Sequence, residues 1–252
     1  MNNRNSEYPL EASQRRVIER ITLKKLIGDI GKILNLERGI LYAIKLLLIN
    51  PGKAVSSYLN EQRFVFFHPL RLLLITSAVS LFSFWLIDGA ESMGDALQVG
   101  AAPKDQMAEE INQIGQELFI EAFNDYFNAM IWIFIPIISF FSYLFFMKSA
   151  YNYAEHLILN TYITSIGNLI NTVFYLLALV VDIGISSIIA LIVYLGYNLY
   201  SYKSFFKVTT VQMLLRGISS LVLGYFIYMI MLLFIIGISI GFKIAEAGLL
   251  DK

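Results

Sequence analysis

Long apolar runs are the feature that most constrains this chain. A helix needs about 20 mostly apolar residues to cross the roughly 30 Å of hydrocarbon in a bilayer. Runs of that order occur at about 70–87, 129–147, 157–181, 183–202 and 217–242. Only 15% of the residues are charged, against about 25% in an ordinary soluble domain. The sequence therefore predicts an all-α fold, a polytopic membrane helical bundle with five transmembrane helices.

One acidic residue separates the third run from the fourth. The apolar stretch from Leu157 to Tyr202 is too long for a single span, and Asp182, with Gly184 beside it, lies near its middle. A carboxylate is costly in hydrocarbon. We therefore expect Asp182 at a membrane interface, in the turn between two helices.

Basic residues are distributed unevenly between the flanks of these runs. Residues 1–69 contain eleven Lys and Arg against six Asp and Glu, whereas the loop 88–128 contains one, Lys104, against nine acids. Lys and Arg are enriched in the cytoplasmic flanks of spans. We therefore expect 1–69 to be a cytoplasmic segment, 88–128 an external acidic loop and 243–252 an external tail, in a protein of the bacterial cytoplasmic (inner) membrane.

Helices outside the spans are also expected. Residues 23–34 have a basic amphipathic pattern, typical of a helix on the inner leaflet or of one that packs on the protein's own helices. Residues 40–49 are apolar but too short to cross. Asn50-Pro51-Gly52 predicts a further interfacial helix with Asn50 as its N-cap, running toward Arg63. In the external loop, residues 105–128 show another amphipathic helical period.

A candidate polar site follows from the two histidines of the chain, both expected at the cytoplasmic membrane face. Arginine binds phosphate with two parallel hydrogen bonds, and basic residues at this face attract anionic lipid. If the side chains converge, they form a site for a lipid phosphate or, alternatively, for a proton or a metal. If they do not, they only anchor or cap helix ends. The candidate lipid- or phosphate-binding residues are Arg63, His68, Arg71, Glu155 and His156.

A second polar feature lies in the third run. Six polar residues recur there at helical spacing on one face, and polar groups at membrane depth must face protein or water. They either line a substrate path or form hydrogen bonds between helices, and the sequence favours the second. The stripe consists of Thr161, Thr164, Ser165, Asn168, Asn171 and Thr172.

These patterns exclude several function classes. Nineteen Lys and Arg balance nineteen Asp and Glu, so nothing indicates a nucleic-acid partner. The absence of Cys removes thiol nucleophiles and Cys-ligated zinc, and no phosphate loop, dinucleotide fingerprint or hydrolase motif occurs. We expect no cofactor and no resident metal. The sequence favours a non-enzymatic membrane organiser or adaptor that engages lipids, other membrane proteins or a second copy of itself. The alternatives are a small-molecule or ion transporter with a polar path along the third span, and an intramembrane lipid-modifying enzyme.

The run from Gly39 to Lys53, with Phe66-Phe67-His68-Pro69 before a leucine-rich span, resembles a bacterial multi-span membrane family of unknown function. Glu155-His156-Leu157 and the stretch 197–200 look similar too, so that the resemblance covers about residues 38–240. Members of that family commonly begin with a Cys-x-x-Cys zinc ribbon, which this chain lacks. The five spans are more loosely similar to those of Yip1-type membrane proteins. The resemblance implies a multi-span inner-membrane protein and supplies no known activity.

Overall fold

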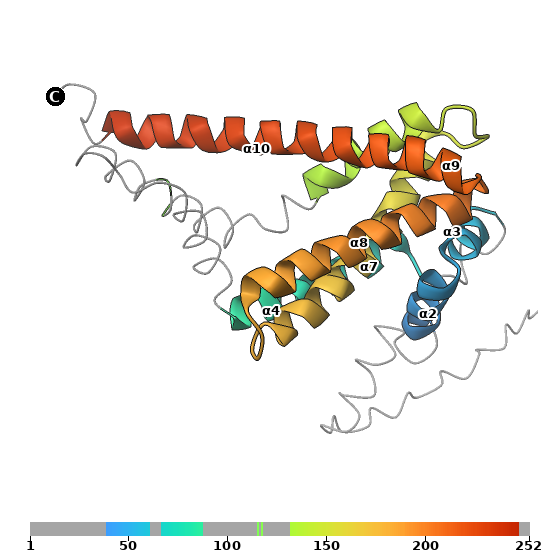
Figure 1. Cartoon of the computed structure of the whole chain (residues 1–252), viewed down its shortest axis with the longest axis horizontal. Coiled ribbons are helices and arrows are strands. Elements are labelled where there is room, and N and C mark those ends of the chain that lie inside the picture. Colours follow the sequence, from blue (N-terminus) through green and yellow to red (C-terminus); the bar gives the residue numbers. More distant parts are fainter. Residues whose placement is uncertain (1–38, 61–66, 88–114, 116, 118–131, 247–252) are drawn as a thin grey trace, which may run out of the picture. The chain divides into compact units, whose positions relative to one another are not determined.

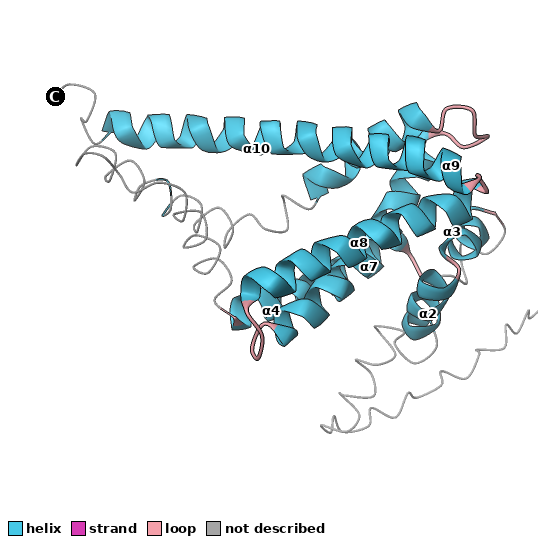
Figure 2. Ribbon diagram, viewed as in Figure 1, coloured by secondary structure: helices cyan, strands magenta, loops and turns pink. Residues whose placement is uncertain are grey.

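The computed structural model describes residues 39–60, 67–87, 115, 117 and 132–246. All regular secondary structure in these ranges is helical (Figure 2), which confirms the all-α class. The chain divides into two units at residues 38 and 39, and the described helices belong to the second unit. The predicted basic helix at 23–34, Arg63, nearly all of the external loop and the end of the C-terminal tail lie outside the described residues.

Within residues 39–60, two short helices precede the first apolar run. Helix α2 spans Leu41–Ile49 and α3 spans Pro51–Leu59. The Asn50 side chain accepts a hydrogen bond from the Lys53 backbone N–H at 3.0 Å, with Pro51 at the first helical position. The predicted cap is therefore confirmed. Proline fits there because the first helical N–H has no partner within the helix.

In the described part of the chain, three helical segments are long and apolar enough to cross a membrane. They are α4 (Pro69–Leu86), α8 (Ile183–Phe206) and the segment Thr210–Ile235. The last consists of α9 (Thr210–Gln212), the π-helical turn η2 (Met213–Gly217) and the first part of α10 (Ile218–Glu246). The chain is therefore a helical protein with candidate transmembrane helices.

The other two expected spans differ from these three. The helix Trp132–Phe145 is apolar but has fewer than 18 residues in the described part of the chain. Helix α7 (Tyr153–Leu177) has 25 residues, enough to cross, but it is more polar than the three, because it contains a glutamate, a histidine and three asparagines. It also carries the polar stripe, and four of the six stripe residues are buried. Most of these polar side chains are therefore packed against other helices of the bundle.

The apolar stretch 157–202 is broken where the sequence predicts. Helix α7 ends at Leu177, and α8 begins after Asp182, whose carboxylate accepts a hydrogen bond from the Ile185 backbone N–H at 3.0 Å. Figure 1 shows α7 and α8 side by side, joined by this short turn. The Tyr202 hydroxyl near the end of α8 bonds Asn160 near the start of α7, so the two helices are antiparallel.

Helix α4 packs beside α7 in the parallel direction, as three contacts along both helices show. The Tyr162 hydroxyl donates to the Phe67 carbonyl oxygen at 2.6 Å, just before α4. Further along, the Asn168 amide donates to the Ser77 hydroxyl at 2.9 Å. Near the far ends, the rings of Phe84 and Tyr175 have centroids 5.3 Å apart. Since the contacts follow the same order along both helices, α4 and α7 run in the same direction.

Helix Trp132–Phe145 packs on α10 through small residues. The Phe134 ring contacts Tyr225 and Tyr228, with centroids 4.9 and 5.1 Å away. A Cβ at Gly224 would lie 2.5 Å from the Ile138 Cδ1 atom, so glycine permits this approach. Ser220, one turn earlier, is fully buried. This Ser-x-x-x-Gly pair seats a neighbouring helix, as small residues do in membrane bundles.

The outer faces of α8 and α10 are apolar and uncovered. In their apolar windows only 17% of the residues are buried. Ile188 and Ile192 of α8 are 61% and 63% exposed, and Leu233 of α10 is 64% exposed. Soluble monomers rarely expose continuous apolar surface of this kind. These faces fit a lipid environment.

Candidate functional site

The structure places His156 inside the helical bundle. Its side chain is fully buried, between Tyr143 in an edge-to-face contact and Phe206 with ring centroids 5.0 Å apart. The Nδ1 atom forms a 2.7 Å hydrogen bond with the Ser142 hydroxyl. Within the described part of the chain, the buried Nε2 atom has no hydrogen-bond partner. His156 is thus a component of the packed interior.

The Ser142 hydroxyl belongs to a buried polar network across three helices. The Asn160 amide donates to Ser142 Oγ at 3.1 Å and to the His156 backbone carbonyl at 2.9 Å. The Tyr202 hydroxyl donates to Asn160 Oδ1 at 2.8 Å. Side chains of helix Trp132–Phe145, α7 and α8 are joined in this way. Such buried networks are stabilising when each member finds a partner.

Glu155 lies next to His156 in sequence but has a different role. Its carboxylate accepts a 2.8 Å hydrogen bond from the Asn152 backbone N–H, and the Asn152 side chain accepts one from the Glu155 backbone N–H at 3.1 Å. This is a capping box at the start of α7. Glu155 therefore begins a helix, which is one of the two roles expected for it.

His68 and Arg71 lie at the start of α4 and are exposed. The His68 ring contacts Tyr58 of α3 edge-to-face, with centroids 5.9 Å apart. The Arg71 guanidinium carbon lies 5.8 Å from the centre of the Phe67 ring, a cation–π contact. The described contacts thus join His68 to α3 and His156 to helix Trp132–Phe145, whereas Arg63 lies outside the described residues.

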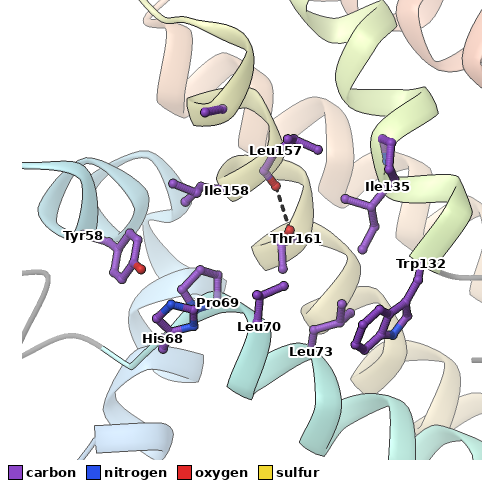
Figure 3. Close-up of a pocket in the computed structure, with 12 residues that line it drawn as sticks. Tyr58, His68, Pro69, Leu70, Leu73, Trp132, Ile135, Leu157, Ile158 and Thr161 are labelled. Atoms are coloured by element: carbon purple, nitrogen blue, oxygen red, sulfur yellow. Dashed lines mark hydrogen bonds between the residues drawn. The ribbon is translucent and has the colours of Figure 1, made fainter.

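His68 also lines an open apolar groove of 410 Å³. Figure 3 shows Tyr58 and His68 on one side of it and Trp132 on the other, with Leu70, Leu73 and Thr161 between them. The Thr161 hydroxyl is occupied by a 2.7 Å hydrogen bond to the Leu157 carbonyl, drawn in the same view. The remaining lining residues are Pro69, Ile135, Pro136, Ala154, Leu157 and Ile158.

The polar side chains of the α7 stripe form hydrogen bonds largely within the bundle. Thr161, Ser165 and Thr172 each donate to a carbonyl four residues earlier in α7. Asn168 instead reaches α4, where its amide bonds Ser77 at 2.9 Å. Thr164 is buried, and Asn171 is partly exposed.

Several residues in these contacts were not predicted from the sequence as members of a site. Ser142 and Ser77 partner the predicted His156 and Asn168, and Asn160 and Tyr202 complete the buried network. A signal was available for α4, because its buried polar residues recur every three to four positions on one helix face. These residues are Thr76, Ser77, Ser80 and Ser83.

The Asn-Pro-Gly turn docks on the end of α8. The Gly52 backbone N–H donates to the Ser204 hydroxyl at 3.0 Å, and that hydroxyl donates to Asn50 Oδ1 at 3.1 Å. The Tyr197 hydroxyl donates to the Leu47 carbonyl at 3.1 Å, and Tyr200 bonds the Ile49 carbonyl. A Cβ at Gly52 would overlap the Ser204 carbonyl, so this approach requires glycine.

Within the described ranges, no group of three or more His, Cys, Asp or Glu side chains is placed to hold a metal ion. The geometry there consists of capped helices, a buried hydrogen-bond network and one apolar groove with a histidine at its edge. Taken with the three long apolar helices, this defines the class: a membrane-embedded helical protein.

Comparison with known proteins finds a match to a family model over one part of the chain. Residues 37–81 match the family model described as "Protein of unknown function (DUF3667)". The match begins just before α2 and ends within α4, and it includes the Asn-Pro-Gly turn, His68 and Arg71. The resemblance to a family of unknown function is therefore confirmed over these residues, and the rest of the predicted resemblance stays a prediction. No curated protein and no solved structure matches the chain.

Proposed function

We propose that this chain is a five-span protein of the bacterial inner membrane with a cytoplasmic N-terminus and an external C-terminus. Its role is non-enzymatic: it organises the membrane by engaging lipids and other membrane proteins through its cytoplasmic face. The antiparallel pairing of α7 with α8 supports the third and fourth spans.

Charge at the helix ends supports this orientation. Four exposed lysines lie in α3, in the turn before α7 and at the end of α8. The end of α8 contacts α3 through Gly52 and Ser204, and it contacts the turn before α7 through the stacked rings of Phe205 and Tyr151. These lysines therefore belong to one side of the bundle. Cytoplasmic flanks are rich in Lys and Arg, which also attract anionic lipid. The four are Lys53, Lys148, Lys203 and Lys207.

The observation that carries the non-enzymatic, non-transporting role is the bond between Asn168 and Ser77. Asn168 is 4% exposed, and its amide is used in joining α7 to α4. A transport path along this stripe requires the amide to face water instead. A lipid-modifying enzyme requires His68 and Glu155 to act together, whereas Glu155 caps α7 and His68 contacts Tyr58.

Single cysteines test the orientation directly, because the natural chain has none. Lys53→Cys, Lys207→Cys and Asp182→Cys are each expressed in cells and treated with a membrane-impermeant maleimide. We expect labelling of Asp182→Cys in intact cells and of the other two only after lysis. Labelling of Lys207→Cys in intact cells would contradict the orientation.

A fourth variant separates an organiser from a transporter. Asn168→Cys is expected to resist a small water-soluble thiosulfonate reagent in the folded protein and to react after denaturation. Asp182→Cys, in the exposed turn before α8, is the positive control for reaction in the folded protein. Rapid reaction of Asn168→Cys in the native state would favour the transporter. Affinity purification of the folded protein from native membranes, with mass spectrometry of lipids and proteins, then identifies what it engages.

A further inference from the structure

The apolar groove beside His68 lies at the beginning of α4. Pro69 starts that helix, and its 18 residues, at about 1.5 Å each, extend about 27 Å. This length is close to the roughly 30 Å of the hydrocarbon layer. In the proposed orientation, His68 is therefore at the inner boundary of the hydrocarbon, and the groove opens where lipid headgroups meet acyl chains.

The walls of the groove match a lipid at this depth. Leu70 and Leu73 come from α4, Leu157 and Ile158 from α7, and Ile135 from helix Trp132–Phe145. None of the lining residues is a carboxylate, and His68 is the basic residue among them. Arg71, one turn into α4, is a second exposed basic residue at the same level. The groove thus combines an apolar floor with His68 at its inner edge, and Arg71 lies in the first turn of the same helix, an arrangement that complements a phosphate attached to a hydrocarbon chain.

Pro136 removes one regular helical hydrogen bond from a wall of the groove. Proline has no backbone N–H, so the regular helical bond to the Trp132 carbonyl cannot form. Both residues line the groove, together with Pro69 at the start of the opposite helix. The two helices are separated here by the surface of α7, which forms the floor (Figure 3).

We infer that this groove is a binding site for one anionic phospholipid of the inner leaflet, with an acyl chain against Leu70, Leu73 and Trp132 and the phosphate at His68. Its volume of 410 Å³ lies in the range of about 300–1,000 Å³ that is typical of small-molecule sites. An apolar groove open to a bilayer is not favourably filled by water, because its walls offer few hydrogen-bond partners. This binding site rests on the proposed membrane orientation, and it specifies the class of lipid that the cytoplasmic face binds.

The two tryptophans of the chain provide the assay. Trp132 lines the groove, whereas Trp85 lies at the opposite end of α4 and is 66% exposed. Trp85→Phe leaves only the groove tryptophan, and Trp132→Phe leaves only the control. Each full-length protein is reconstituted into vesicles of phosphatidylcholine that contain a small fraction of phosphatidylglycerol with brominated acyl chains, which quench tryptophan on contact.

We expect Trp132 to be quenched at a lower fraction of brominated phosphatidylglycerol than Trp85, with saturation. Brominated phosphatidylcholine, as the minor lipid, should reach Trp132 about fivefold less effectively, which corresponds to the roughly 1 kcal/mol that one Lys or Arg contributes near an anionic membrane surface. Equal quenching of the two tryptophans by both lipids overturns the inference.

Substitutions test the acyl-chain contact and the phosphate contact of the groove separately. Ala154→Phe fills the groove and should abolish the excess quenching of Trp132, whereas Ala78→Phe, on an exposed face of α4 outside the groove, should not. His68→Ala should remove the preference for phosphatidylglycerol, whereas Lys148→Ala should leave it unchanged. If His68→Ala keeps the full preference, the phosphate contact is wrong. If Ala154→Phe keeps the excess quenching, the acyl-chain site is wrong.

A different occupant gives a different result. If a second copy of the chain covers the groove, Trp132 is shielded from both brominated lipids, and crosslinking of Ala154→Cys yields a disulfide-linked dimer. That outcome overturns the lipid assignment. The maleimide labelling of Lys53→Cys, Lys207→Cys and Asp182→Cys reports the membrane orientation separately, so a failure of the groove and a failure of the proposed function are distinguishable.

Discussion

Tyr202 near the end of α8 donates a 2.8 Å hydrogen bond to Asn160 near the start of α7, and both side chains are almost fully buried. Asn160 in turn bonds Ser142 of helix Trp132–Phe145. Three successive helices of the chain are joined through one amide. Since the amide has few other possible partners in this apolar interior, these bonds help to fix the register of the helices.

Tyr202→Phe is expected to destabilise the protein by about 1–2 kcal/mol, because the buried Asn160 oxygen loses its donor. Unfolding in mixed micelles with increasing dodecyl sulfate measures the change. Tyr143→Phe is the control, since the described contacts of Tyr143 are ring contacts with Tyr153 and His156. Equal destabilisation by both substitutions would argue against the network.

Gly52→Ala is expected to destabilise the protein by about 1–3 kcal/mol, because the added Cβ overlaps the Ser204 carbonyl and pushes α3 away from α8. Thermal unfolding in detergent measures the loss. Gly196→Ala is the matched control: nothing lies within 4 Å of its added Cβ, and alanine favours a helix interior over glycine. An unchanged midpoint for Gly52→Ala would show that this docking is loose.

His156→Ala is expected to cost about 2–4 kcal/mol, because it leaves a cavity and removes the partner of Ser142. His68→Ala, on an exposed residue, is expected to change stability by less than about 0.5 kcal/mol. The double variant should show the sum of the two effects, since the two histidines share no described partner. A coupling well above experimental error would indicate that they form one site after all.

Asn168→Ala is expected to destabilise the protein by about 0.6–2 kcal/mol, the usual value of a hydrogen bond between membrane helices. The lost bond is the 2.9 Å contact to Ser77. Asn171→Ala, in the same helix and partly exposed, serves as the reference and should have a smaller effect. Double-mutant analysis with Ser77→Ala, again by unfolding in mixed micelles, measures the pair directly. A larger loss for Asn171→Ala would place the important polar contact elsewhere on α7.

The predicted candidate site shows where reasoning from the sequence stops. His68 and His156 were expected at one level of the membrane, and both do lie near the first turns of a helix, before α4 and within α7. Sequence distance to a helix start indicates depth along the bundle axis. It does not indicate the direction in which a side chain points around its helix, which depends on the neighbours. His156 points to Ser142, and His68 points toward the groove.

The third span illustrates the same division. Its polar stripe is visible from the spacing of Thr161, Ser165 and Asn168, because the helical period depends only on the backbone. The choice between a water path and bonds to other helices depends on Ser77, which is 91 residues away from Asn168.

By itself, the sequence determined the helical class, the N-cap at Asn50 and the break at Asp182. These follow from the local balance of apolar length, backbone capping and charge, which acts within one or two helical turns. Only the tertiary structure decided which polar groups meet, that Gly52 rests on Ser204, and that α4, α7 and helix Trp132–Phe145 leave a groove beside His68. Those outcomes depend on the packing of side chains from separate helices, and a local pattern indicates which face of a helix is packed but not which residues of another helix it meets.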